Sequence, residues 1–291
     1  MPFYFHETMI SGARTDTEGT AAGIQEIARV MTNHMGWTTE DDNTALAGAN
    51  HKMILRSPGE DPGPAFYLIM TSGAGSGQNQ NTIGIQIATA WDSIANAVPS
   101  SGVITPAATT ASYLQTDSNG FYTLILSGDK DSVVVISRAN DENDRVFFGR
   151  CKNFLPQSLE PFGLYLLSDN DTTTRLTEQT TTKAIVGNPP IALEAASDSV
   201  LLSFGFDTTN EPRIGISSTA VAPVFTAFPM VLFASNTSPV EKGAIGVAKN
   251  AWAFLLNTVG LNDEMIFTVS GSSETYQVRV GTAESFIYRR T

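Results

Sequence analysis

Short runs rich in Val, Ile, Leu, Phe and Tyr recur along most of the chain, separated by clusters of Gly, Pro, Asp and Asn. This spacing predicts antiparallel β-strands joined by turns. One hairpin is expected between residues 52–56 and 65–71, across SPGEDPGP. Another is expected between residues 121–127 and 131–137, with Gly128 adopting a positive φ in the turn. Further strands are predicted at residues 145–151, 162–168, 199–206, 212–217, 230–234, 264–270, 275–280 and 285–289.

One segment near the N-terminus has the periodicity of a helix instead. Its apolar residues follow the i, i+3, i+4, i+7 spacing of a single face: Ile24, Ile27, Ala28, Met31 and Met35. Thr15 and Glu18 form a capping box at its start, and Gly36 is a typical residue for its end. We therefore predict an amphipathic helix over residues 17–35. A second, shorter helix is predicted over residues 91–97.

Together these patterns predict a mainly β protein, with antiparallel β-sandwich or barrel-like lobes and one N-terminal amphipathic helix. The Thr-rich passage after residue 169 offers few apolar anchors. We therefore expect the helix and a first β-rich lobe over residues 1–170, a Thr-rich linker or loop over 171–190, and a second β-rich lobe over 191–291. A single intertwined domain is the alternative. Residues 72–81, SGAGSGQNQN, predict another exposed loop.

Composition limits the possible partners. Hydrophobic residues make up 42% of the 291, which is ample for a core. The chain has 17 Lys plus Arg against 29 Asp plus Glu, a net charge of −12, so we expect no direct contact with nucleic acid. A single cysteine cannot form an intrachain disulfide, which suits folding in a reducing cytosol. The N-terminus lacks the pattern of a signal peptide, and Pro223 and Pro229 interrupt the longest apolar run, so no membrane span is predicted.

No motif indicates a catalytic, cofactor or metal site, and we expect no enzyme. His6, His34 and His51 have no second His or Cys at ligand spacing, so surface or partly buried imidazoles are expected. Cys151 ends a predicted strand, which favours a buried structural thiol. Acidic clusters such as residues 141–144 favour solvated turns over a calcium site. A pair of carboxylates for glycoside hydrolysis stays open, because a separation in space defines it.

The block at residues 131–170 carries a more specific pattern. It resembles a recurrent segment of uncharacterised virion structural proteins from tailed bacteriophages. The matching residues are Val133 to Val135, Arg138, Val146 to Gly149, Pro156, Pro161, Phe162 and Leu164. FPMVLFA at residues 228–234 is similar to a short strand of that family, and residues 243–280 with 282–291 are similar to its closing region.

The resemblance implies a structural component of the virion, an adaptor of the tail, baseplate or neck, made in the host cytoplasm. Its implied partners are other virion proteins, with several copies around the tail axis. In such an adaptor we expect residues 3–9, FYFHETM, and the Thr-rich loop to contact neighbouring subunits. The alternative is a host-recognition module of the tail, which would bind a surface glycan through exposed aromatic and amide side chains. Which virion station is occupied, and in how many copies, is left open by the sequence.

Overall fold

A computed structural model describes residues 3–11, 16–44, 51–58, 65–72, 82–88, 112–116, 121–139, 142–153, 162–170, 183–186, 201–204, 228–235, 242–254, 264–268, 271–280 and 285–291. The elements are β1 (Tyr4–Ile10), α1 (Asp16–His34), β2 (Thr38–Asp42), β3 (Lys52–Arg56), β4 (Tyr67–Ser72), β5 (Thr82–Ala88), β6 (Ser112–Gln115), β7 (Tyr122–Gly128), β8 (Ser132–Ala139), β9 (Glu142–Asn153), β10 (Phe162–Asn170), β11 (Lys183–Val186), β12 (Leu201–Phe204), β13 (Phe228–Ser235), β14 (Lys242–Phe254), β15 (Ile266–Thr268), β16 (Thr275–Val280) and β17 (Ser285–Arg289).

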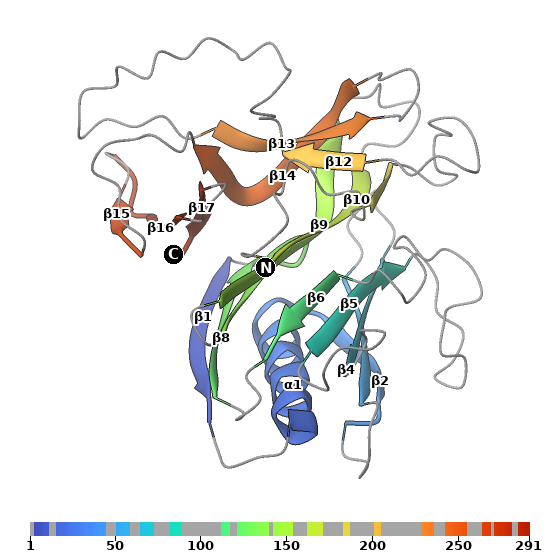
Figure 1. Cartoon of the computed structure of the whole chain (residues 1–291). Coiled ribbons are helices and arrows are strands. Elements are labelled where there is room, and N and C mark those ends of the chain that lie inside the picture. The colour runs from blue at the N-terminus through green and yellow to red at the C-terminus, as the bar shows by residue number, and fades with distance from the viewer. Residues whose placement is uncertain are drawn as a thin grey trace.

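The strands form two antiparallel sheets, which confirms the mainly β prediction. The larger sheet has twelve strands, with the central order β1-β7-β8-β9-β14-β17-β16-β15. The smaller sheet has five strands in the order β2-β3-β4-β5-β6. Figure 1 shows α1 lying between the β1-β7-β8 end of the larger sheet and the smaller sheet. The two sheets and the helix therefore form three layers in this part of the molecule.

The helix α1 confirms the predicted amphipathic segment to within one residue at each end. Ile24, Ile27 and Met31 of its apolar face are fully buried. After the helix, Gly36 has a φ of 79°, which glycine adopts without strain, and the Trp37 amide then donates to the Met31 carbonyl oxygen at 3.2 Å. Thr15 of the predicted capping box and the predicted helix at residues 91–97 lie outside the described ranges.

One apolar core fills the space between the three layers. Side chains alternate along a strand, so every second residue of the facing strands points into this core. The smaller sheet contributes fully buried residues such as Leu68 and Ile85, and the larger sheet contributes others such as Leu124 and Phe148. The apolar face of α1 contacts both groups.

Both predicted hairpins are confirmed, as β3–β4 and β7–β8, and β9 pairs with β8, so that β7, β8 and β9 form a meander. The prediction for Gly128 was wrong. It ends β7 without a positive φ, and a Cβ there would lie 2.2 Å from the Ser132 carbonyl oxygen, so it is close backbone approach that requires glycine. The turn is formed by the Asp129 side chain, which accepts from the Asp131 amide at 2.8 Å and the Ser132 amide at 3.0 Å.

Later strands lie where they were predicted, at β10, β12, β13, β15, β16 and β17. The predicted strand at residues 212–217 lies in a part of the chain that is not described. Residues 183–186, inside the predicted Thr-rich linker, form β11 and pair with β10. β8 and β14 lie end to end along one edge of β9, so the larger sheet draws strands from both predicted lobes. The division into lobes stays a prediction.

Candidate interaction site

The histidines singled out in the sequence lie in separate environments. His6 is in β1 and His34 is near the end of α1, where its ring stacks on Tyr4 with 3.9 Å between centroids. His51 precedes β3 and is buried, whereas a surface or partly buried imidazole was expected. Among the described residues, no three His, Cys, Asp or Glu side chains are grouped to hold a metal ion. The predicted burial of the Cys151 thiol stays a prediction.

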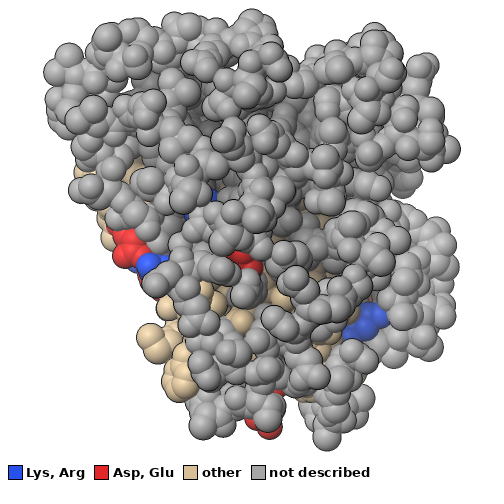
Figure 2. Space-filling view, viewed as in Figure 1, with Lys and Arg blue, Asp and Glu red and all other residues tan. Residues whose placement is uncertain are grey.

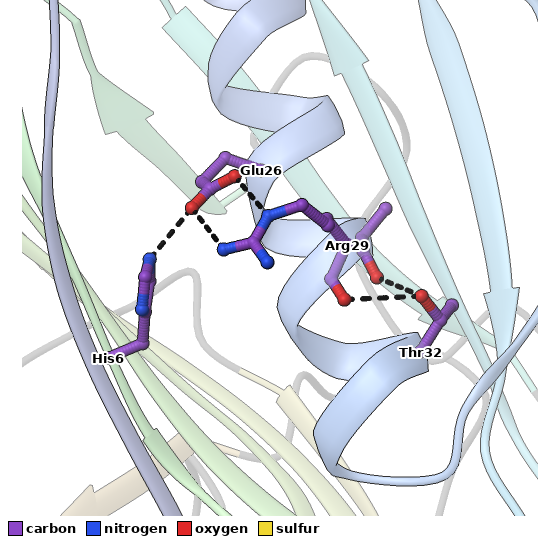
Figure 3. A network of polar contacts seen from close by, with 5 residues as sticks. His6, Glu26, Arg29 and Thr32 are labelled. Carbon is purple, nitrogen blue, oxygen red and sulfur yellow. Dashed lines mark hydrogen bonds and ion pairs between the residues drawn. The ribbon is translucent and has the colours of Figure 1, made fainter.

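A polar network joins one face of β1 to α1 (Figure 3). His6 Nε2 lies 2.7 Å from Glu26 Oε1, and Arg29 donates to both Glu26 oxygens at 2.7 and 2.8 Å. The hydrogen bond from Arg29 lowers the pKa of Glu26, and this effect with that of His6 outweighs the opposing effect of burial. Both carboxylate oxygens of Glu26 therefore already have polar partners, and the network fixes β1 against α1.

The other face of β1 contacts the C-terminal strand β17 and the residues after it. Arg290 lies over the Phe5 ring at 4.3 Å and 3.5 Å from a Glu7 carboxylate oxygen. Arg289 lies over the Phe3 ring at 4.6 Å, and its carbonyl oxygen accepts a 2.6 Å hydrogen bond from Ser127 of β7. The strand β1 is thus held between α1 on one face and the C-terminal residues on the other.

Four described strands of the larger sheet pair with one neighbour only: β1, β11, β12 and β15. Two of these edge strands, β1 and β15, carry or adjoin exposed apolar side chains. Among the described strands, β1 pairs with β7 alone and β15 pairs with β16 alone. Met9 on β1 is 66% exposed and Ile266 on β15 is 53% exposed, while Met265 directly precedes β15. Phe121, diagonal to Met9 across the β1–β7 pair, is the fourth exposed large apolar residue of the described part. An edge strand offers unpaired backbone groups to another chain.

A second polar cluster, which the sequence did not reveal, is enclosed in the protein. Arg150 Nη1 lies 3.3 Å from Asp131 Oδ1, and the two side chains are 1% and 4% exposed. The guanidinium also lies over the Phe66 ring at 5.4 Å and 3.5 Å from Ser57 Oγ. This ion pair ties the β7–β8 turn and β9 to the loop end of the β3–β4 hairpin, where Ser57 follows β3 and Phe66 precedes β4. It is closed to solvent, so its role is to join the two sheets.

The charged side chains of the described residues are scattered over the surface and form no large patch on the face shown in Figure 2. Figure 2 shows the acidic and basic side chains of one face in small, separate groups. Several are ion pairs across the surface, such as Arg289 with Glu274 at 2.9 Å. The one helix in the described part of the chain is α1, and it is not long and apolar enough to cross a membrane.

Comparison of the sequence with models of known protein families gives no match, and comparison with curated proteins gives no match either. The resemblance to virion proteins of tailed phages therefore stays a prediction.

Proposed function

We propose that this protein is a non-enzymatic structural component of a tailed-phage virion, an adaptor of the tail, baseplate or neck that acts through protein–protein contacts. One observation carries the proposal. Two edge strands of the larger sheet carry an exposed apolar side chain, Met9 on β1 and Ile266 on β15. A molecule with two such edges is suited to joining two neighbours.

The physical basis is strand addition. The outward edge of a strand presents alternate N–H and C=O groups that another strand satisfies, while nearby side chains give specificity. Single exposed apolar residues are common on protein surfaces, so their position matters more than their number. Here Met9 lies on an edge strand whose two faces are held firmly by α1 and by Arg290. A strand held in this way needs little ordering before a partner binds.

The network around Glu26 supports the same role. A general base needs a free carboxylate oxygen near a substrate, whereas both oxygens of Glu26 already accept hydrogen bonds from Arg29 and His6 lies beside one of them. The alternative, a glycan-binding module of the tail, needs several exposed aromatic rings together. Among the residues whose burial is described, Phe121 is the single large aromatic side chain that is exposed. The adaptor is therefore the better-supported function.

The test is incorporation into particles. In the phage that encodes this chain, the gene is deleted and the protein is supplied in trans, and purified particles are examined by immunoblotting and for infectivity. We expect the wild-type protein in the particles and restored infectivity. The Met9→Asp/Ile266→Asp variant should fold, because both residues are exposed, yet be missing from particles. Asn33→Asp on α1, also exposed, adds one negative charge, against two in the double variant, away from the sheet edges and should behave as wild type.

Two results would overturn the adaptor function. One is the absence of wild-type protein from particles whose infectivity it restores. The other is binding of the purified protein to host cells in the absence of any particle, competed by extracted surface polysaccharide, which would support glycan recognition instead.

A further inference from the structure

We propose that the edge of β1 with which no described strand pairs is the site where β1 of a second copy of this chain pairs, antiparallel, about a two-fold axis that passes through Glu7. The inference rests on the proposed assembly function, since it names the occupant of one of the sheet edges that carry an exposed apolar side chain. It follows from the order of residues in β1, from the face on which each lies, and from the charges beside the axis.

The faces of β1 restrict the possible registers. Tyr4 and His6 lie on the face that contacts α1, and Phe5 and Glu7 lie on the face that contacts the C-terminal residues. Residues directly opposite each other in an antiparallel pair share a face. Two copies related by a two-fold axis place residues of the same face opposite each other when the axis passes through a residue of the strand. Glu7 is the central residue of Tyr4–Ile10, so an axis at Glu7 pairs every residue of β1.

This register is self-complementary. It places Tyr4 opposite Ile10, Phe5 opposite Met9, and His6 opposite Thr8 of the second copy. Apolar residues thus meet at both ends of the strand and polar residues meet in the middle. Aromatic and aliphatic cross-strand pairs of this kind stabilise a sheet. Met9, 66% exposed in one copy, would be covered by Phe5 of the other.

The neighbouring registers are worse. An axis through His6 places Phe5 opposite Glu7, and an axis through Thr8 places Glu7 opposite Met9. Each sets a carboxylate against an apolar side chain and pairs fewer residues of the strand. The order of polarity along β1 therefore selects the axis at Glu7.

The charges at the axis balance. The two Glu7 carboxylates meet there, and like charges directly opposite each other destabilise a sheet. Arg290 lies 3.5 Å from Glu7 within each copy, so the group at the axis holds two carboxylates and two guanidinium ions. Over longer distances the two copies repel each other, since each carries a net charge of −12. Added salt screens that repulsion and should strengthen the dimer.

Disulfide crosslinking tests the register. In a Cys151→Ser background, Glu7→Cys places two cysteines opposite each other at the axis, with Cα atoms about 4.5–5.5 Å apart, within disulfide range. Met9→Cys is the matched control, because the two Met9 positions are offset by four residues, about 14 Å along the strand. Under mild oxidation we expect about tenfold more covalent dimer for Glu7→Cys than for Met9→Cys. Equal yields, no dimer from either variant, or dimer from Met9→Cys alone would overturn the inference.

Light scattering tests association of the unmodified chain. Its mass should rise with concentration from 31.1 kDa toward twice that value, and more readily at higher salt. Met9→Lys should remain monomeric, whereas Ile266→Lys, exposed at the opposite end of the sheet, should dimerise as wild type does. A wild-type chain that stays monomeric, or a Met9→Lys dimer as stable as that of the wild type, would overturn the inference.

The two proposals fail separately. A chain that enters particles but stays monomeric in purified form overturns the β1 dimer and leaves the adaptor function standing. A chain that dimerises through Glu7 but is missing from particles supports the β1 dimer and overturns the adaptor function.

Discussion

Removing the guanidinium of Arg150 should destabilise the protein more than any surface substitution would. Arg150→Met keeps most of the side-chain volume but removes the contact with Asp131, and it leaves the Asp131 carboxyl buried without that charge beside it. It also removes the cation from the face of Phe66. The junction between the two sheets is weakened as a result.

The magnitude follows from these contacts. A hydrogen bond to a charged group contributes about 1.5–3 kcal/mol. A desolvated cation–π contact contributes about 1–2 kcal/mol. The contact with Ser57, at 3.5 Å, adds little. The sum, about 2.5–5 kcal/mol, overlaps the usual cost of breaking a buried ion pair by removing one partner, about 3–5 kcal/mol.

Urea unfolding followed by circular dichroism measures this cost. With a slope of about 3 kcal/mol per molar urea, a loss of about 4 kcal/mol lowers the midpoint by about 1.3 M. Arg56→Met is the matched control, since Arg56 is exposed and lies 4.0 Å from Glu40, so its loss should cost less than about 0.5 kcal/mol. Arg150→Met/Asp131→Asn should cost less than the sum of its single variants. Additive costs, or a cost for Arg150→Met as small as the control's, would refute the reasoning.

Three further predictions concern other sites. Glu26→Gln should lower the free energy of unfolding at pH 7, because the pKa of Glu26 is lowered in the folded state. The difference in stability between wild type and variant should shrink as the pH falls below about 4.5. A difference that is unchanged at pH 2.5 would contradict this. Lys52→Met should raise the free energy of unfolding at pH 7, since burial lowers the pKa of Lys52. The gain should disappear above about pH 10.5, where the amine is neutral in both the folded and the unfolded chain. A gain that persists there would show that desolvation of the charged amine is not its cause. Gly23→Ala should cost about 2 kcal/mol, because its Cβ would lie 2.0 Å from the Tyr122 hydroxyl oxygen. Adding Tyr122→Phe should recover part of that cost in thermal unfolding, whereas strict additivity would exclude the clash.

Local sequence patterns predicted much of the fold because local forces determine those elements. The spacing of Ile24 and Met31 specified the buried face of α1, and the turn residues specified the hairpins. The strand β14 was not predicted, because Lys242–Phe254 is rich in Ala and Gly, which have low strand propensity. Its pairing with β13 and β17 determines its conformation instead. Gly128 was misjudged for a related reason, since the close neighbour at Ser132 is visible only after the hairpin forms.

The candidate site was predictable only in part. Residues 3–9 were expected to contact neighbours on the strength of the family resemblance, but their strand conformation was not predicted. β1 has the polar residues His6, Glu7 and Thr8 at its centre, so it lacks the alternation that marks a strand. Its partner β7 lies more than a hundred residues further along the chain, and no local signal connects the two. The pairing of Arg150 with Asp131 is equally invisible in sequence, because it depends on how β9 lies beside the β7–β8 turn.

The position of β9 determines an order of assembly during synthesis on the ribosome. β7, β8, β9 and β10 are consecutive, so they can pair as soon as the chain has emerged to Asn170. The last residues of β9, Lys152 and Asn153, pair with β14, which is translated much later. Until then the nascent chain holds a partly formed sheet with an open edge, the state in which aggregation competes with folding. Translational pausing between β10 and β14 should therefore lower the yield of soluble protein more than pausing after β14.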